Sequence, residues 1–415
     1  MVLQRDDHRG QTVLSRGYSF AAVDVGYLRS AAGAAALQEA AGYALADATR
    51  IADIVALRAR FGDRTPALVE TTLLRRRAAA KLDGIAGSAQ WLFTDEALQQ
   101  ASAGAVALHR ARRIEAAAPG AVVHDVTCSI GTELAALGPS DRQLVGSDLD
   151  PVRLAMAEHN LGGRAALVHA DALHPVTRDA VVLADPARRT GGQRRFNPRD
   201  YQPALDRLLD VYRDRSIVVK CAPGIDFDAI RSLGFRGEIA VSSWRGSVRE
   251  ACLWSCALAE PGVHRRASIL DSGEQITDAE PDECEVRPAG RWIIDPDGAV
   301  VRAGLVRHYG ARHRLWQLDP EIAYLSGDRL PAGVRGFEVV EQLDYSEKRL
   351  RAALTALDCG SLEILVRGVR DVSADPDALR RRLRLRGQHS LTVVITRIGS
   401  GRAGRAAAFV CRASR

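Results

Sequence analysis

The chain has 415 residues, of which 47% are hydrophobic and 26% charged, and its formal net charge is +6. This length exceeds what a single hydrophobic core supports, so we expect two or three domains. The seven cysteines are scattered without a Cys-x-x-Cys pair or a matched Cys/His spacing, and no apolar run is long enough to cross a bilayer. We therefore expect a soluble, cytoplasmic protein without a metal site or disulfide framework, whose basic balance favours an anionic partner.

Residues 1–104 are predicted to form a helical N-terminal domain, because alanine and leucine recur there at helical spacing. The clearest helices are residues 45–60 and 66–82, and Thr65 is the expected cap of the second. The basic triplet 75–77 within that second helix either lies on a solvated face or contacts nucleic acid.

A further helix over residues 95–115, capped by Thr94, is predicted to lead into the next domain. Its position allows two interpretations. It either covers a cofactor cleft or packs at a domain junction.

The segment 122–148 has the pattern of a βαβ unit. An apolar strand ends at Asp125, a tight loop runs from Thr127 to Gly131, and a helix is expected to begin with Thr132 as its cap. A second apolar strand then ends at Asp148. This order is typical of a nucleotide-binding unit, although a βαβ unit with ordinary turn residues would look the same.

The number of glycines in the loop indicates which nucleotide binds. A dinucleotide site needs Gly-x-Gly-x-x-Gly for its pyrophosphate, whereas here only Gly131 is a glycine. S-adenosylmethionine has no phosphates and needs one close backbone approach, an acid near its ammonium and an acid for its ribose. We assign the approach to Gly131, the acids to Asp125 and Asp148, and the rest of the cofactor-binding loop to Thr127, Cys128 and Ser129.

Two more strands are predicted to end at acids, Asp171 and Asp185. Ligands of open α/β sheets bind at the carboxyl ends of the strands, so these acids are expected at the same cleft. We assign Asp171 to the adenine amine, and we assign Leu149 and Ala172, which follow Asp148 and Asp171, to the cofactor site. Asp150 either joins the ribose contacts or only begins a helix with Pro151.

The sequence Asp185-Pro186-Ala187-Arg188 is the candidate reaction centre. It resembles the Asp-Pro-Pro-aromatic motif of amino-group methyltransferases and the Asp-Pro-Pro-Arg motif of uridine-C5 RNA methyltransferases, which implies catalytic roles for Asp185, Pro186 and Arg188. No aromatic residue follows here to stack on a base. The arginine-rich loop 188–199 is either a solvated segment or a contact for substrate phosphate.

Cys221 lies in a Lys-Cys-Ala-Pro segment that resembles the Ser-Cys-Asn-Pro motif of the uridine-C5 enzymes, where the cysteine attacks the base. A nucleophilic thiol needs a lowered pKa, and neighbouring strand residues such as Lys220 point to the opposite face. We expect a buried, dispensable cysteine.

Residues 105–262 are therefore predicted to be the α/β catalytic domain and residues 263–415 a small C-terminal α+β domain. In the latter, the strand Leu-Glu-Ile-Leu-Val-Arg-Gly and a basic helix through Arg380–Arg386 resemble a THUMP-like domain. The arginine face of this helix either binds RNA or is merely solvated.

Together these parts resemble bacterial class I S-adenosylmethionine-dependent methyltransferases with a C-terminal THUMP-like domain. The resemblance implies a Rossmann-like catalytic domain and methyl transfer from S-adenosylmethionine to structured RNA. The alternatives are a non-catalytic module that binds S-adenosylmethionine or RNA and, more distantly, a NAD-dependent oxidoreductase. The target atom and the oligomeric state do not follow from the sequence.

Overall fold

The computed structural model describes residues 18–138, 142–188, 198–369, 376–399 and 404–414. The chain divides into two compact units, residues 1–219 and 220–415, and each is described by itself. This division falls inside strand β7 (Ile217–Cys221) and therefore marks no linker. The domain boundaries expected after residues 104 and 262 stay a prediction.

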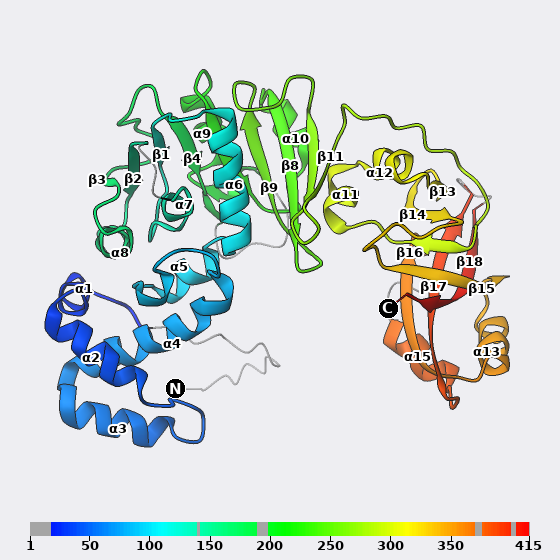
Figure 1. Cartoon of the computed structure of the whole chain (residues 1–415), viewed down its shortest axis with the longest axis horizontal. Helices are drawn as coiled ribbons and strands as arrows, with labels where there is room; N and C mark the ends of the chain where they lie inside the picture. The colour runs from blue at the N-terminus through cyan, green and yellow to red at the C-terminus, as the bar shows by residue number, and fades with distance from the viewer. Residues whose placement is uncertain (1–17, 139–141, 189–197, 370–375, 400–403, 415) are drawn as a thin grey trace, which may run out of the picture. The chain divides into compact units, whose positions relative to one another are not determined.

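The first unit begins with a helical region, coloured blue to cyan in Figure 1, as the alanine-rich sequence predicted. Its long helix α4 (Thr65–Lys81) buries Leu68 and Leu74 completely. The other helices of the region are α1 (Ala22–Leu28), α2 (Ala31–Ala41), α3 (Arg50–Phe61), α5 (Asp95–Gln100) and α6 (Gly104–Ala117), with short 3₁₀ turns at Gly62–Arg64 and Ser88–Gln90.

Of three helix starts predicted in this region, two differ from the structure and one agrees with it. The helix expected from residue 45 begins at Arg50, because Leu45 adopts a left-handed φ of 51° that no helix continues. Thr65 lies inside α4 instead of capping it. Thr94 does cap α5, since its hydroxyl accepts a hydrogen bond from the main-chain N–H of Ala97 at 3.0 Å.

The single helix expected over 95–115 is two helices, α5 and α6. The chain turns at residues 101–103, where Ala101 has an extended ψ of 141°. Gly104 then passes so close to the neighbouring backbone that a Cβ there would lie 2.1 Å from the carbonyl oxygen of Asp83. This close approach fixes the turn.

The basic triplet 75–77 serves the fold. Arg75 donates to the carbonyl oxygens of Gln90 and Trp91, and Arg76 donates to carbonyl oxygens at the end of α2, among them that of Ala41. Arg77 pairs with Asp95 at the start of α5. All three guanidinium groups therefore bond neighbouring segments, while Arg76 and Arg77 stay exposed, as a solvated face predicts, and Arg75 is half-buried.

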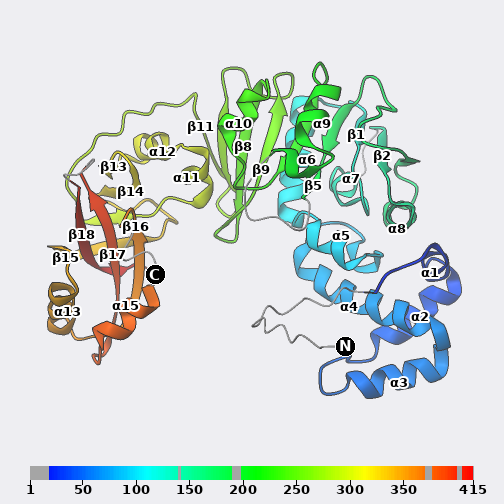
Figure 2. The same ribbon diagram turned by 180° about the vertical axis from the view of Figure 1, so that it is seen from behind.

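The rest of the first unit is a parallel sheet of strands β1 (Val123–Asp125), β2 (Leu144–Asp148), β3 (Ala166–His169), β4 (Val181–Ala184) and β7, in the order β7-β4-β1-β2-β3. The register places Val123 opposite both Leu144 and Val181, so β1 is central. Helix α6 lies on one face and α9 (Leu205–Val211) on the other (Figures 1 and 2). Helices α7 (Thr132–Ala136) and α8 (Pro151–Leu161) are the crossovers of the predicted α/β fold, which is confirmed.

A short two-stranded sheet lies after β4. Strand β5 (Ala187–Arg188) pairs antiparallel with β6 (Tyr201–Gln202), and a 3₁₀ turn at Pro198–Asp200 precedes β6. The chain therefore leaves β4 through β5 and comes back in β6, which lies beside β5.

The second unit contains, first, the antiparallel hairpin of β8 (Gly237–Trp244) and β9 (Ser247–Ser255). Strand β10 (Arg265–Ile269) runs parallel to β8, and β11 (Glu274–Thr277) pairs with β10. The helix before this hairpin is α10 (Phe227–Ser232).

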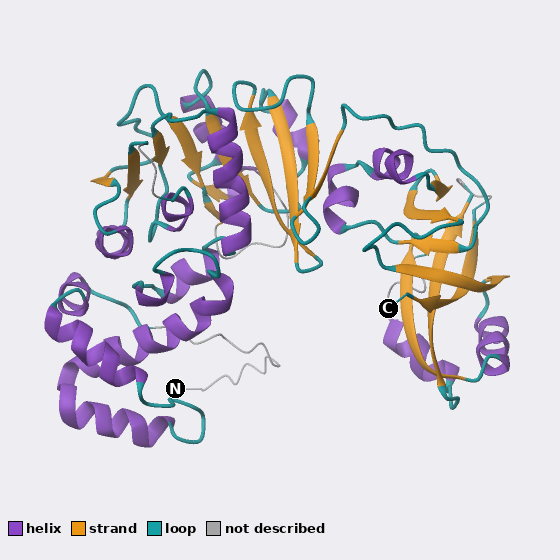
Figure 3. Cartoon of the chain, in the orientation of Figure 1, coloured by secondary structure: helices purple, strands orange, loops and turns teal. Residues whose placement is uncertain are grey.

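The second unit ends in a seven-stranded sheet, yellow to red in Figure 1 and shown as strands in Figure 3, with the order β13-β14-β12-β15-β18-β17-β16. Helices α13 and α15 contribute Leu350, Leu354, Leu379 and Leu383 to a core on β16 and β17. The bounds are β12 (Trp292–Ile294), α11 (Gly298–Ala303), α12 (Val306–His313), β13 (Trp316–Asp319), β14 (Ile322–Gly327), β15 (Gly336–Asp344), α13 (Glu347–Ala356), β16 (Cys359–Arg367), α15 (Pro376–Leu383), β17 (His389–Ile398) and β18 (Arg405–Ala413).

The segment after Pro296 forms the helix α11, because the carboxylate of Asp297 accepts the main-chain N–H of Ala299 at 2.7 Å and caps it. One prediction for this region is corrected. The basic helix expected through Arg386 ends at Leu383, since Arg384 has a left-handed φ of 52°.

The buried His124 of β1 leads to a stability prediction. Its ring nitrogens lie 2.9 Å from the Thr177 hydroxyl and 3.0 Å from the Ser147 hydroxyl. Burial, and then nearby Arg215, lowers the pKa of His124 to about 4. A histidine in the unfolded chain has a pKa of about 6.5. Between these two pKa values the unfolded state therefore binds more protons than the folded state, and the free energy of unfolding falls as the pH falls.

We expect the free energy of unfolding of wild type to lose at most about 1.4 kcal/mol per pH unit through His124 in this window. His124→Gln, which keeps a donor and an acceptor, removes that part of the pH dependence. Urea unfolding at pH 7, 6 and 5 measures both proteins. Parallel pH profiles for the two would contradict the assignment.

Candidate functional site

The four acids predicted at strand ends line one cavity of about 400 Å³ at the carboxyl edge of the first unit's sheet. Asp125 ends β1, Asp148 ends β2, Asp171 follows β3 and Asp185 follows β4. Four further predicted cofactor-binding residues, Thr127, Cys128, Ser129 and Leu149, also line it, as does Ala172. Gly131, Pro186 and Arg188 are not among the lining residues.

The loop between β1 and α7 is held by its own backbone. Cys128 donates its N–H to the Ser147 carbonyl at 2.9 Å, and Gly131 donates to the Cys128 carbonyl at 2.8 Å. Ser129 and Gly131 both adopt left-handed backbone, with φ of 48° and 88°. A side chain at 131 would also meet Leu161 at 3.0 Å, so the single glycine stands where both conformation and space require it.

Gly131, and not the predicted Thr132, precedes the first turn of α7. The Thr132 hydroxyl is buried and has no hydrogen-bond partner among the described residues, so it does not cap the helix. The correction has a simple cause: the left-handed glycine already turns the chain into the helix.

Asp148 ties this loop to the end of β2. One carboxylate oxygen accepts the N–H of Ser129 and the other accepts the N–H of Asp150, both at 2.9 Å. Each carboxylate oxygen has a second lone pair, so Asp148 keeps acceptor capacity toward the cavity. Leu149 beside it is 60% exposed, an apolar side chain held open on the cavity wall.

Asp150 begins helix α8, which is one of the two roles that the sequence allowed. Its carboxylate accepts the main-chain N–H groups of Val152 and Arg153 at 2.8 and 3.1 Å and caps α8. It is not among the lining residues. The helix-start interpretation is therefore correct.

A buried network surrounds Asp125. Its carboxylate is 1% exposed and accepts the N–H of Thr127 at 3.1 Å. Burial first, and then the negative charge of Glu133, raises the pKa of Asp125 well above its usual range. Glu133 itself lines the cavity and pairs with buried Arg110 of α6. The site thus concentrates negative charge that a cationic ligand would relieve.

Hydrogen bonds hold Asp171 and Ala172 in place. Asp171 accepts the N–H of Leu173 at 2.9 Å, and the carbonyl of Ala172 accepts the hydroxyl of Tyr212 at 2.7 Å. Both residues remain on the cavity wall.

The Asp185 segment is joined to the loop after β1. The main-chain N–H of Asp185 donates to the Thr127 hydroxyl at 2.6 Å. Pro186 is buried, and the backbone of Arg188 belongs to β5 while its side chain lies outside the described part of the structure. Pairing of β5 with β6 brings Gln202 and Pro203 to the cavity as well.

The helical region supplies a wall that the sequence did not assign to particular residues. Ala97 and Gln100 of α5, with Ala101 and Ser102 of the following turn, line the cavity. The segment therefore borders the cavity at the strand ends, as one of its two interpretations predicted.

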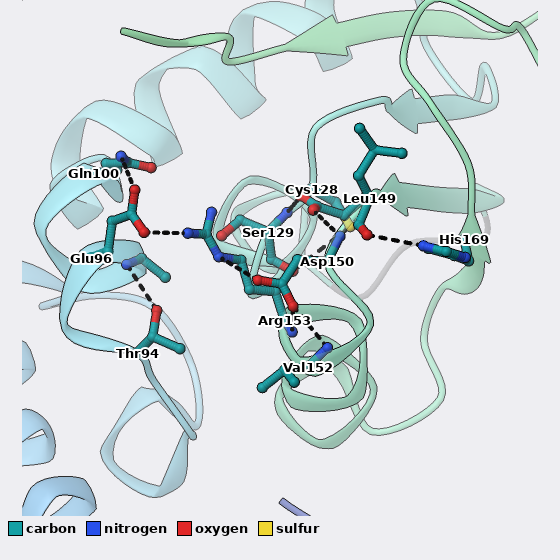
Figure 4. Close-up of polar contacts among 12 residues, drawn as sticks. Thr94, Glu96, Gln100, Cys128, Ser129, Leu149, Asp150, Val152, Arg153 and His169 are labelled. Atoms are coloured by element: carbon teal, nitrogen blue, oxygen red, sulfur yellow. Dashed lines mark hydrogen bonds and ion pairs between the residues drawn. The ribbon is translucent and has the colours of Figure 1, made fainter. Parts of the chain in front are cut away.

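Hydrogen bonds fix that wall to the sheet. Ser102 donates to Glu133 at 2.6 Å, and buried Asn160 of α8 bonds both main-chain groups of Leu92 and the carbonyl of Ile130. Glu96 of α5 pairs with Arg153 at 2.7 Å, and Arg153 also reaches Asp150 at 3.3 Å (Figure 4). Only spatial proximity reveals these residues, because each is an ordinary helix residue in the sequence.

Cys221 is 4% exposed and is not among the residues that line the cavity. Its dispensability stays a prediction.

The predicted RNA contacts lie partly outside the described residues. Within loop 188–199, residues 189–197 are not described, and Arg199 pairs with Asp206 at 3.4 Å. In the second unit Arg380 donates to the Leu362 carbonyl at 2.8 Å and Arg382 pairs with Glu347 at 2.6 Å. Arg381, Arg384 and Arg386 are exposed. Leu379 and Leu383 are buried, so the other face of α15 packs against its own unit.

Across the described ranges, none of the helices could span a membrane. The same residues contain no group of three or more His, Cys, Asp or Glu side chains placed to hold a metal ion.

Two family models match the chain, a THUMP domain-like model over residues 334–413 and a domain of unknown function over residues 22–78. Among solved structures, one described as a methyltransferase from Porphyromonas gingivalis W83 is similar, with a TM-score of 0.71 and 20% identity over 92% of this chain and 98% of that one. At this identity the similarity shows the fold alone.

Closer relatives come from two strains of Mycobacterium tuberculosis, CDC 1551 / Oshkosh and ATCC 25618 / H37Rv. Each is 69% identical over 365 residues, which covers 86% of this chain and 100% of the relative. Both are named as uncharacterized S-adenosylmethionine-dependent methyltransferases. The strand order, the acid-lined cavity and this identity agree, and the chain belongs to the S-adenosylmethionine-dependent methyltransferases, with a Rossmann-like catalytic fold and a C-terminal THUMP-like domain.

Proposed function

We propose that this methyltransferase acts on structured RNA. The observation that carries the proposal is the presence, in one chain, of a methyltransferase cavity and a THUMP domain-like segment over residues 334–413. THUMP domains, which this segment resembles, bind RNA. The exposed arginines at 381, 384 and 386 and the net charge of +6 support an anionic partner.

S-adenosylmethionine fits the charge of the cavity. It carries a sulfonium and an ammonium, and the cavity offers Asp125 and Glu133 at the end where α5, α6 and the loop 127–131 meet. We assign the ammonium to Asp125, with Gly131, Thr127, Cys128 and Ser129 shaping the backbone around the methionine part. The buried Ser129 hydroxyl, which has no partner among the described residues, agrees with a polar ligand there.

The ribose and adenine are assigned to the β2 and β3 ends. The free acceptor capacity of Asp148 suits the two ribose hydroxyls, and Asp171 suits the adenine amine. The exposed Leu149 and the buried Ala172 would contact the adenine ring, which explains an apolar side chain left open to solvent.

The methyl acceptor is assigned to the edge formed by Asp185, Pro186 and Arg188. The hydrogen bond from the main-chain N–H of Asp185 to the Thr127 hydroxyl fixes Asp185 relative to the loop 127–131. The Asp185 side chain can then hold the methyl acceptor or take its proton. The arginine loop 188–199 adjoins this edge in sequence, and we propose that it contacts substrate phosphates.

The alternative is a module that binds S-adenosylmethionine or RNA without catalysis. Incubation with radiolabelled S-adenosylmethionine and total RNA from a strain that lacks the protein, followed by nucleoside analysis, tests the proposal. Labelled nucleosides support it. Label in protein overturns the RNA assignment, and absence of turnover with intact cofactor binding supports the alternative.

Replacement of Asp148 should weaken cofactor binding. Asp148→Ala removes the ribose acceptors and should cost roughly 1–3 kcal/mol of binding free energy, measured by calorimetry with S-adenosylmethionine. Asp150→Asn is the matched control, because asparagine still caps α8 and residue 150 does not line the cavity. Equal affinities for wild type and Asp148→Ala would refute the ribose assignment.

Cofactor binding should release a proton from Asp125. The raised pKa of Asp125 leaves the free carboxyl partly protonated above the usual range, and a bound ammonium favours its ionised form. Affinity should therefore rise with pH through the raised pKa, by up to about tenfold per unit. Calorimetry in buffers of different ionisation enthalpy measures the released proton, and Asp125→Asn should abolish it. Proton release that persists in this variant would show another titrating group.

Asp185→Ala should separate chemistry from binding. The Thr127 bond goes to the main-chain N–H of residue 185 and survives the substitution, so the loop stays in place. Turnover should fall by roughly 10²-fold or more while the affinity for S-adenosylmethionine stays nearly constant. Asp179→Ala in an exposed loop is the control. Full turnover by Asp185→Ala would move the reaction centre elsewhere in the cavity.

A further inference from the structure

The turn between β8 and β9 presents a tryptophan and two arginines, Trp244, Arg245 and Arg249, which we call the hairpin tip. Trp244 pairs with Ser247, and Arg245-Gly246 form the two-residue connection. Both connecting residues have positive φ, 51° and 65°, as in a type I′ turn.

Arginine is an unfavourable residue at the first position of such a turn. Asparagine and glycine are preferred there, because the Cβ of other residues crowds the backbone when φ is positive. Strain of this kind persists at sites where the side chain itself is used, which directs attention to the Arg245 guanidinium.

Both arginines of the hairpin tip lie against the indole. Their guanidinium carbons are 4.2 Å (Arg245) and 5.5 Å (Arg249) from the Trp244 ring centroid. Arg249 also donates to the Trp244 carbonyl at 2.9 Å, which holds its side chain in place. Trp244 is half-buried and both arginines are exposed.

The charges of the hairpin tip are not neutralised by acids. Within the described ranges neither Arg245 nor Arg249 forms an ion pair, and Asp271 beside the turn accepts the main-chain N–H of Gly246 at 3.3 Å.

Two other arginine–tryptophan contacts of this unit behave differently. Arg287 on Trp316 pairs with Glu285. Arg291 on Trp292 pairs with Glu338 at 2.8 Å. The hairpin tip thus keeps two ordered, exposed cations where comparable stacks of the same unit are internally compensated.

We propose that the hairpin tip binds an unpaired nucleotide of the RNA substrate, through base stacking on the planar guanidinium–indole group and ionic contact with phosphate. Stacking on aromatic rings and arginine planes is the common mode by which proteins hold unpaired bases, and it tolerates any base. The proposal rests on the proposed RNA function and adds a contact outside the cofactor cavity.

The test uses the full-length protein and two fluorescent RNA probes of equal length, a mixed-sequence single strand and the matching duplex. The variant Arg245→Asn/Arg249→Gln removes both charges and creates the favoured Asn-Gly turn. We expect it to bind the single strand roughly 5- to 100-fold more weakly, to bind the duplex nearly as wild type, and to melt at an equal or higher temperature. Its melting temperature and its affinity for S-adenosylmethionine confirm an intact fold.

Two further variants separate stacking from charge. Trp244→Leu keeps an apolar side chain but loses the ring, and it should also weaken single-strand binding, whereas neutralising exposed Arg58 of α3 by Arg58→Gln should not. Unchanged single-strand affinity in the double variant overturns the proposal. It is also overturned if the double variant binds the single strand more weakly but Trp244→Leu does not, because a patch of positive charge without base stacking would then explain the binding.

The nucleoside analysis of methylated RNA keeps this proposal distinct from the proposed function. If wild type methylates RNA while the hairpin variants bind and methylate normally, only the hairpin proposal fails. If the variants lose single-strand binding while wild type labels protein and not RNA, the hairpin tip still contacts an unpaired nucleotide, but that RNA is not the substrate and the RNA-methylation proposal fails.

Discussion

The site depends on one electrostatic constraint, the convergence of carboxylates at the carboxyl edge of a parallel sheet. Asp125, Asp148, Asp171 and Asp185 follow four neighbouring strands, and Glu133 joins them from α7. Burial first, and then the negative charges of Glu133 and of the neighbouring aspartates, raises the pKa of Asp125 well above its usual range. Main-chain N–H groups and buried Arg110 offset that repulsion.

The same constraint explains why the helical region borders this cavity. Glu133 needs Arg110 of α6 and the Ser102 hydroxyl, and both require the break between α5 and α6 at residues 101–103. A continuous helix would carry Ser102 away from Glu133. The turn therefore converts a packing region into a wall of the cofactor cavity, and Asn160 and Arg153 anchor that wall to α8.

Arginine has three different uses in this protein. At 75–77 it satisfies helix ends and carbonyl groups inside the fold, and at 380 and 382 it is largely held by neighbours of its own domain. At the hairpin tip it is ordered on an indole and left without an acid. The number of arginines alone thus does not locate an anion-binding surface, whereas their partners do.

The sequence by itself determined the α/β order, the four acids, the single loop glycine and the small C-terminal α+β region. These depend on local signals: apolar runs for buried strands, an acid at each strand end, and Gly131 where φ is 88°. Parallel strands bring their carboxyl ends to one edge, so a list of strand ends already predicts a shared cavity.

Only the tertiary structure decided the rest, because the remaining signals are ordinary in sequence. Thr132 looks like a cap but follows a left-handed glycine, Asp150 caps α8, and the arginines of the triplet 75–77 bond neighbouring carbonyl groups and Asp95. Glu133, Ser102 and Arg153 carry no motif, and they enter the cavity through contacts between segments far apart in the chain. Periodicity reports which face of an element is apolar, whereas the partner of a polar side chain is set by which elements the fold brings together.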